Sequence, residues 1–315
     1  MNTGATLVIQ FALTAAVAPL VTGFVRLTKA RLTRKKGPSP LQPYRDLYRL
    51  IRKETVVAEN ASWIFTGAPT FIAGTTLAAA LLVPTFVFDA GLAAFADLLT
   101  LVGLLAAARF ALALAGLDIG TSFGGIGASR EMLIAAVAEP ALWALIFSLA
   151  LVAGSTRLAD IAWFVQSPGL GLRISLLLAF VGFVMVAIAE NGRIPIDNPA
   201  THLELTMVHE AMVLEYSGRH LALIEYAASL KLTLYIALIA AIFVPWGIAD
   251  RNSGPAAEGF AILFFLAKLL GGACGLGFLE VTTAKLRVFR TPQFLGTALM
   301  LGLLAALLQL VSRSL

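Results

Sequence analysis

The sequence contains few of the charged residues that cover the surface of a water-soluble protein. Only 13% of its 315 residues are charged, whereas 59% are hydrophobic, and its mean hydropathy is +0.89. A soluble globular domain has about 25% charged residues. This composition excludes a water-soluble fold and predicts that lipid is the main solvent of the chain.

The chain has a single cysteine, Cys274, which lies among apolar residues. One thiol can build neither a disulfide nor a cysteine-ligated zinc or iron–sulfur site. His202 and His209 are too far apart along one helix to share a metal without a third element. We therefore predict no metal site, no catalytic residue and no cofactor within this chain, so that any electrons travel in partner subunits.

Long apolar runs alternate with short polar connections along the sequence. A membrane-spanning helix needs about 20 mainly apolar residues, and the chain offers eight such runs. We predict an all-α integral membrane protein in which residues 1–315 form a single domain, a bundle of about eight transmembrane helices. Four glycines within residues 120–127 predict a flexible connection. The predicted spans are residues 6–25, 64–88, 92–117, 131–153, 170–190, 221–247, 259–284 and 293–312.

Basic residues are distributed unevenly between the two sides of these spans. Ten Lys or Arg fall within residues 26–53, and the positive-inside rule places such a loop in the cytoplasm. With this orientation, sixteen basic residues lie inside and four outside. Both termini are then predicted to be outside. The same bias explains the net charge of +5, so nucleic-acid binding is not expected.

The first cytoplasmic loop, residues 26–60, contains a second structural signal. Two prolines within residues 37–40 stop the preceding helix, and residues 41–57 then mix aromatic and aliphatic side chains with basic ones. This mixture predicts an amphipathic helix on the membrane surface. Its partner is either the anionic lipid headgroups or a docked protein subunit. The basic residues concerned are Arg45, Arg49 and Arg52.

A second, acidic cytoplasmic loop, residues 191–220, and its flanks concentrate many of the titratable groups of the chain. Its acidic residues are Glu190, Asp197, Glu204, Glu210, Glu215 and Glu225, and its basic residues include Arg193, Arg219 and Lys231. Thr201 can cap a helix that begins near His202. On such a helix Glu204 and Glu215 share one face.

Several charges fall within or at the ends of the predicted spans. Glu139, Glu190 and Glu225 are acidic, and the basic residues are Arg109, Lys231 and Lys268. A charge near the bilayer centre costs at least about 2.5 kcal/mol, so these groups are expected to face one another or a hydrated cavity. Coupled groups of this kind can exchange protons near neutral pH, which predicts a proton relay. Static ion pairing that stabilises the bundle is the alternative.

The spacing of these residues resembles a known family. Residues 190–227 are similar to the cytoplasmic loop between the fifth and sixth helices of the respiratory complex I subunit 1 family, and more so to the membrane subunits of group 4 NiFe hydrogenases, notably formate hydrogenlyase subunit 4. The residues that carry the pattern are Glu190, Arg193, Pro195, Asp197, Pro199, Glu204, Leu205 and Glu215-Tyr216-Ser217-Gly218.

This resemblance implies a subunit of the bacterial inner membrane that anchors a hydrophilic hydrogenase arm. The expected partners are the hydrogenase large and small subunits and antiporter-like membrane subunits, and the NiFe centre and iron–sulfur clusters are expected in those partners. The implied acidic funnel beneath the arm consists of Glu190, Asp197, Glu204, Glu210 and Glu215, with Arg193 and Arg219 setting its charge balance and Glu139 and Glu225 continuing it into the membrane. Transfer from the family is firmest for the residues of the shared pattern, whereas Glu139, Glu225, Lys231 and Lys268 rest on the cost of a buried charge.

The sequence departs from the quinone-reducing members of the family. After Pro199 those members read close to Pro-Glu-Gly-Glu, whereas residues 200–204 here read Ala-Thr-His-Leu-Glu. The departure favours a hydrogenase complex over the alternative, a quinone-cavity subunit of a complex I-type NADH dehydrogenase. A third possibility, a separate transporter, is disfavoured because no internal repeat relates the two halves.

Overall fold

The computed structural model describes residues 3–88, 95–166, 174–197, 208–249, 254–286 and 290–314. In these ranges the chain forms helices and no β-strand, which confirms the all-α membrane fold. The helices are α1 (Thr3–Leu32), α2 (Gln42–Arg52), α3 (Trp63–Leu82), α4 (Leu98–Asp118), α5 (Ser122–Ala153), α6 (Leu158–Gln166), α7 (Ile174–Glu190), α8 (His209–Val213), α9 (Gly218–Phe243), α10 (Pro255–Thr282) and α11 (Thr291–Ser314).

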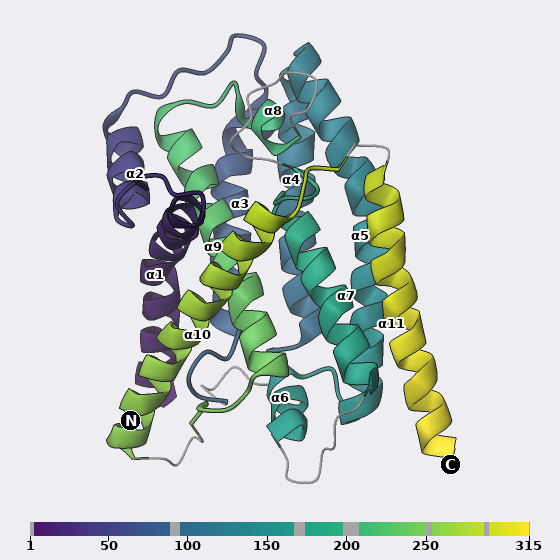
Figure 1. Ribbon diagram of the computed structural model, residues 1–315. Coiled ribbons are helices and arrows are strands. Elements are labelled where there is room, and N and C mark those ends of the chain that lie inside the picture. Colours follow the sequence, from purple (N-terminus) through teal and green to yellow (C-terminus); the bar gives the residue numbers. More distant parts are fainter. Residues whose placement is uncertain are drawn as a thin grey trace.

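Each predicted span overlaps one of these helices. Seven of the described helices are long and apolar enough to cross a membrane, and α7 is a shorter apolar helix of 17 residues. The two ends of the chain lie at the same end of the bundle (Figure 1), as an even number of crossings requires. The count of eight crossings and the outside placement of both termini stay predictions.

The glycine-rich segment differs from its prediction. Residues 122–127 are not a flexible connection but the first turns of α5, which begins nine residues before the predicted span. The Thr121 hydroxyl caps this helix by accepting a hydrogen bond from the Gly124 N–H at 3.2 Å. A Cβ at position 124 would lie 2.3 Å from the Gly116 carbonyl oxygen. Glycine is needed here because α4 and α5 approach each other closely.

Two tyrosines complete hydrogen bonds that prolines remove from transmembrane helices. Proline has no N–H, so Pro69 in α3 leaves the carbonyl of Phe65 without its helical donor. The Tyr216 hydroxyl donates to that carbonyl at 2.8 Å. In the same way Pro19 in α1 leaves the carbonyl of Ala15 without its helical donor. The Tyr226 hydroxyl donates to that carbonyl at 3.0 Å. A backbone group left unpaired in lipid is costly, so both hydroxyls stabilise their helices.

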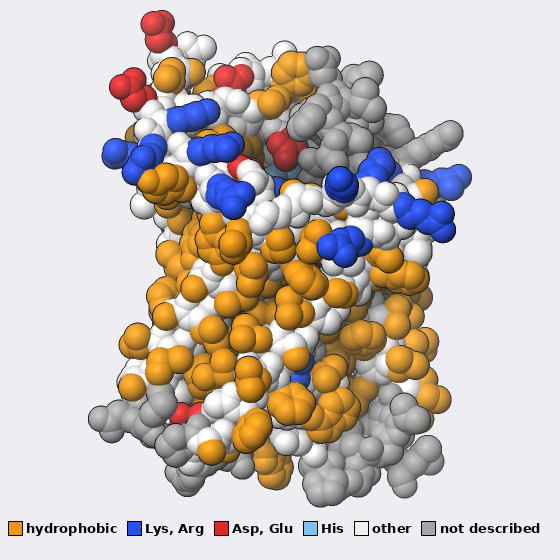
Figure 2. Space-filling view, turned by 60° about the vertical axis from the view of Figure 1, so that its left-hand side comes forward, with side chains coloured by type: hydrophobic (Ala, Val, Ile, Leu, Met, Phe, Trp, Pro, Cys, Tyr) orange, Lys and Arg blue, Asp and Glu red, His pale blue; other side chains and the backbone are white. Residues whose placement is uncertain are grey.

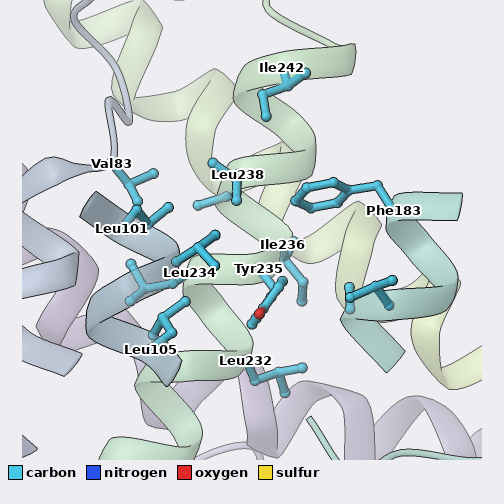
Figure 3. Close-up of a cluster of buried hydrophobic side chains, with 14 of the residues drawn as sticks. Val83, Leu101, Leu105, Phe183, Leu232, Leu234, Tyr235, Ile236, Leu238 and Ile242 are labelled. Atoms are coloured by element: carbon cyan, nitrogen blue, oxygen red, sulfur yellow. The ribbon is translucent and has the colours of Figure 1, made fainter. Parts of the chain in front are cut away.

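Helix α9 lies at the centre of the bundle and contacts α1, α2, α3, α6, α7 and α10. Its lower half carries an almost continuous run of buried side chains between Leu230 and Ile242. Figure 3 shows that these side chains meet Leu101 and Leu105 of α4 and Phe183 of α7. The central position of α9 brings every polar group on this helix close to several neighbouring helices.

The outer surface has the pattern of a membrane protein. Hydrophobic side chains cover the middle of the molecule, and Lys and Arg side chains gather at one end of this apolar band (Figure 2). The basic end carries α2 and α8, and the chain termini lie at the opposite end (Figure 1). The basic residues and the two chain ends therefore lie at opposite ends of the bundle, as the positive-inside prediction requires.

The contact between α9 and α10 depends on one glycine. A Cβ at position 272 would lie 2.4 Å from Cγ2 of Ile236, a branched side chain that cannot move away freely, whereas a Cβ at Gly259 of the same helix meets open space. We predict that Gly272→Ala destabilises the protein by about 1–3 kcal/mol. The Gly259→Ala control should be neutral or slightly stabilising. Thermal unfolding of both solubilised variants measures the difference, and equal midpoints would contradict this packing.

Candidate functional site

Three charged side chains meet deep in the bundle, where α4, α7 and α9 converge. The Arg109 guanidinium in α4 donates to Glu190 at the end of α7, and the two side chains are only 4% and 3% exposed. The Lys231 ammonium of α9 lies 3.0 Å from the second carboxylate oxygen of Glu190. Arg109 also donates to Glu139 of α5. One buried carboxylate therefore lies between two cations, and the network extends to a fourth helix.

This network forms part of the wall of a cavity of about 500 Å³. The cavity is bounded by α1, α3, α4, α5 and α9, by the end of α7 and by α8. Charged groups of both signs line it in equal number, so their total formal charge is close to zero. The lining acids are Glu131, Glu190, Asp197, Glu210 and Glu225, and the lining bases are Arg26, Lys29, Arg109, Arg193 and Lys231.

A second set of ion pairs closes the cavity on the side of α1 and α10. The Glu280 carboxylate of α10 is completely buried, with the Lys29 ammonium 2.6 Å away and the Arg193 guanidinium 3.6 Å away. Asp197 lies 3.0 Å from the Lys285 ammonium. Its other carboxylate oxygen accepts the backbone N–H groups of Val208 and His209 at 3.3 and 3.4 Å. These contacts bind residues 191–197 to α1, α8 and the end of α10.

The cavity environment also affects the protonation of two groups outside the membrane spans. Desolvation, assisted by nearby Lys231, lowers the pKa of His209 from its ordinary value of 6.5 to about 4, although Asp197 acts in the opposite direction. The imidazole is therefore neutral at neutral pH. Desolvation also lowers the pKa of Arg193, an effect that the Glu280 carboxylate opposes.

The structure brings most of the predicted site residues together. Glu190, Asp197, Glu210, Glu225, Arg193 and Lys231 all line the cavity, and Glu139 joins it through Arg109. Glu215 and Arg219 are exposed and lie outside its lining. Lys268 lines a separate apolar groove. Glu204 lies outside the described residues. The role of each residue in proton transfer stays a prediction.

The predicted helix that would align Glu204 with Glu215 needs a correction. Helix α8 begins at His209 and ends at Val213, so Glu215 follows the helix instead of lying on it. The chain turns after α8, where the Tyr216 N–H donates to the Val213 carbonyl at 3.0 Å. The short helix ends here because Tyr216 and Ser217 are held by residues of α3 and of the first loop.

Sequence reasoning missed several groups of the cavity. The span predicted from residue 131 gives Glu131 no role, but α5 begins nine residues before it and carries this side chain into the cavity wall. Arg109 is among the charges expected to face one another, and its contacts with Glu190 and Glu139 confirm this, although the sequence does not say which acid it pairs with. Lys29 and Glu280 were not singled out, and they lie near opposite ends of the chain. The only local signal for such groups is a charge beside or within an apolar run.

The Tyr216-Ser217-Gly218 part of the motif has a structural role. The Tyr216 ring stacks on Phe65 with centroids 4.0 Å apart. The Ser217 hydroxyl accepts the Val56 N–H at 2.8 Å and donates to the Val56 carbonyl at 2.9 Å. Gly218 has φ +53°, and a Cβ there would lie 2.6 Å from the Glu54 carbonyl oxygen. These three residues clamp residues 53–56 to the start of α9.

The amphipathic helix predicted within residues 41–57 is present as α2 and ends at Arg52. Tyr44 on its inner face donates to the carbonyl of Ala16 in α1. Tyr48 and Ile51 are more than half exposed. The predicted basic residues Arg45, Arg49 and Arg52 are exposed as well. A surface that combines exposed apolar and basic side chains suits both predicted partners, headgroups and a docked subunit.

Comparison with known proteins places the chain in a family. The family model described as NADH dehydrogenase matches residues 5–311. The chain belongs to the NADH dehydrogenase subunit 1 family. Two relatives from Escherichia coli K12 are formate hydrogenlyase subunit 4, 33% identical over 88% of this chain and 89% of the relative, and hydrogenase-4 component C, 35% identical over 77% and 78%.

More distant members of the subunit 1 family are also similar. NADH-quinone oxidoreductase subunit 8 of Rhodothermus marinus is 26% identical over 78% of this chain and 74% of the relative. A chain of the archaeal membrane-bound sulfane sulfur reductase has the same fold, with a TM-score of 0.84, 19% identity and coverage of 98% of this chain and 100% of that one.

These likenesses confirm the resemblance inferred from residues 190–227. The protein is a multi-pass membrane subunit of a complex I-like oxidoreductase, which in a bacterium lies in the inner membrane. Among the residues that the structure describes, no three His, Cys, Asp or Glu side chains are placed to hold a metal ion.

The tyrosine of the motif provides a direct test of the clamp. Tyr216→Phe keeps the stacked ring but leaves the buried Phe65 carbonyl without a donor, which costs about 1–3 kcal/mol. We predict that the thermal unfolding midpoint of the solubilised protein falls by several degrees. Tyr48→Phe is the matched control, because the exposed Tyr48 ring lies under Arg52 and needs no hydroxyl for that contact. Identical midpoints for the two variants would show that the Tyr216 hydroxyl does not stabilise α3.

Proposed function

We propose that this chain is the membrane-anchor and proton-coupling subunit of a group 4 NiFe hydrogenase complex of the formate hydrogenlyase type. The observation that carries the proposal is the cavity, with five acidic and five basic side chains at its wall and with Arg109, Glu190 and Lys231 at membrane depth. Apolar helices have no need of such a cavity for folding alone. Its relatives among formate hydrogenlyase and hydrogenase-4 subunits support the hydrogenase assignment.

The ion-pair network provides a path for protons from the cavity towards the side of the bundle. Glu190 and Lys231 face the cavity, and Arg109 joins Glu190 to Glu139. The Glu139 side chain is 44% exposed on α5. Arg109 keeps its own proton and holds both carboxylates on one guanidinium, so a proton passes between Glu190 and Glu139 directly or through water. In the proposed complex, an antiporter-like membrane subunit contacts the bundle near Glu139 and receives the proton.

The basic end of the molecule supports the anchoring part of the proposal. Helix α2 and its exposed basic residues lie at the same end as α8 (Figure 1). In the proposed assembly the hydrogenase large and small subunits dock at this end, and they hold the NiFe centre and iron–sulfur clusters. This chain contributes shape, charge and proton transfer, and no redox centre.

The quinone-cavity function of a complex I-type NADH dehydrogenase is the second candidate. It is favoured by relatives named NADH-quinone oxidoreductase subunits, which are 26–30% identical and cover less of the chain than formate hydrogenlyase subunit 4 does. It is disfavoured by residues 200–204, which lack the pattern of the quinone-reducing members.

Purification of the assembled complex separates these candidates. The tagged chain is isolated from its native membrane in mild detergent, the partners are identified by mass spectrometry, and nickel, iron and quinone are quantified. We expect hydrogenase large and small subunits with nickel. Recovery with NADH dehydrogenase subunits and quinone would move the assignment to the second candidate, and recovery of the chain alone would contradict both.

A substitution at Glu131 distinguishes the proton-transfer function from static ion pairing. Glu131 lines the cavity near Lys231 and Arg109 but forms no direct ion pair with a described residue. We predict that Glu131→Gln leaves assembly intact and lowers proton-coupled turnover by at least about tenfold, because a proton-transferring carboxyl is lost. Glu59→Gln, on an exposed part of the first loop, is the control. Normal turnover in an intact Glu131→Gln complex would exclude this residue from the path.

A further inference from the structure

A second hollow, of about 700 Å³, lies outside the charged cavity and is almost entirely apolar. We call it the α7–α10 groove, because α7 and α10 form its sides, α9 forms its floor and Phe294 of α11 lines one end. Helix α10 packs on α1 and α9, whereas α11 packs on α5 and α7. The two pairs of helices leave the groove between them, and Figure 1 shows α10 crossing the bundle diagonally at this place.

Among the described residues that line this groove, the charged side chains are Lys268 and Arg193, and Arg193 is paired with Glu280. Lys268 lies thirteen residues after Pro255 and fourteen before Thr282, in the middle of α10. At 1.5 Å per residue it is therefore about 20 Å from either end of the helix. The four-carbon side chain of a lysine is too short to bring its ammonium group to the bilayer surface from this depth.

No described carboxylate pairs with Lys268. Arg109, Lys231, Arg193 and Lys285 each have an acidic partner within 4.0 Å, but no ion pair or hydrogen bond from Lys268 to a described residue is formed. An unpaired charge at membrane depth is costly, and such groups face a partner or water in folded membrane proteins. The side chain is only partly buried and lines the hollow, so a partner from outside the chain can reach it.

The shape of the groove fits a helix. Gly271 and Gly275 follow Lys268 by three and seven residues, so all three lie on the same face of α10. A Cβ at either position would meet open space, whereas Gly272 beside them is needed for packing on Ile236. Small residues at this spacing let the backbone of a second transmembrane helix approach closely. The rest of the groove wall is aliphatic and aromatic, which suits the side chains of such a helix.

We propose that the α7–α10 groove receives a transmembrane helix of a neighbouring membrane subunit, and that an Asp or Glu of that helix pairs with Lys268. A lipid acyl chain matches the apolar walls but leaves the ammonium unpaired, because lipid phosphates lie at the bilayer surface. The inference rests on membership of a multi-subunit membrane complex. It does not depend on whether that complex is a hydrogenase or an NADH dehydrogenase.

The first test compares three variants in the native complex. Lys268→Met removes the charge and keeps the length, Lys268→Arg keeps the charge, and Lys36→Met removes an exposed charge of the first loop as a control. The amount of each membrane subunit that co-purifies with the tagged chain is measured by quantitative mass spectrometry. We expect Lys268→Met to lower recovery of one membrane subunit about tenfold while the other partners, Lys268→Arg and Lys36→Met keep normal recovery. Removal of a charge favours membrane insertion, so the Lys268→Met chain itself should be present in normal amount.

Site-specific photo-cross-linking then identifies the occupant. A benzoylphenylalanine residue replaces Leu279 in the groove, or Met300, which is 65% exposed on α11 and lies outside the groove. We expect position 279 to cross-link to a transmembrane peptide that contains Asp or Glu. Replacing that acidic residue with Lys should then restore the assembly of a Lys268→Glu chain. Cross-linking of position 279 to lipid alone, or normal recovery of every membrane subunit with Lys268→Met, would overturn the proposal.

Discussion

Glu190 is held between Arg109 and Lys231 at a depth where an unpaired charge would be costly. Each charge offsets the desolvation of the others, and the loss of any one leaves an uncompensated charge in the bundle. Because the three residues come from α7, α4 and α9, the positions of these helices depend on one another. The cavity beside them is lined by charged groups, an environment that suits water better than apolar side chains.

The same constraint explains the ion pairs around Glu280 and Asp197. Lys29, Arg193 and Lys285 neutralise these two carboxylates, and they bind α1 and α10 to the segment that follows α7. The protein thus has an inner and an outer set of ion pairs with the cavity between them. Lys268 is an exception to this pattern within the described residues, and that is why it indicates a partner from outside the chain.

The apolar helices could be predicted from the sequence because a run of about 20 apolar residues is a local property. The start of α5 could not, since its glycines pack against Gly116 and α8, and these contacts form only between segments distant in sequence. The charged residues near the acidic loop could be predicted as a group because buried charge is costly wherever it occurs. Their partners could not, because Glu280 meets Lys29 and Arg109 meets Glu190 only after helices distant in sequence have packed. The end of α8 before Glu215 likewise depends on Phe65 and Val56, which belong to another part of the chain.

The clamp at Tyr216, Ser217 and Gly218 has a mechanical consequence. It joins residues 53–56 directly to the first turn of α9, and Lys231 lies thirteen residues further along the same uninterrupted helix. A helix of that length, about 20 Å, behaves as a stiff rod. A shift of residues 53–56 would therefore move the start of the same helix that carries the Lys231 ammonium, with no break in α9 between the two points.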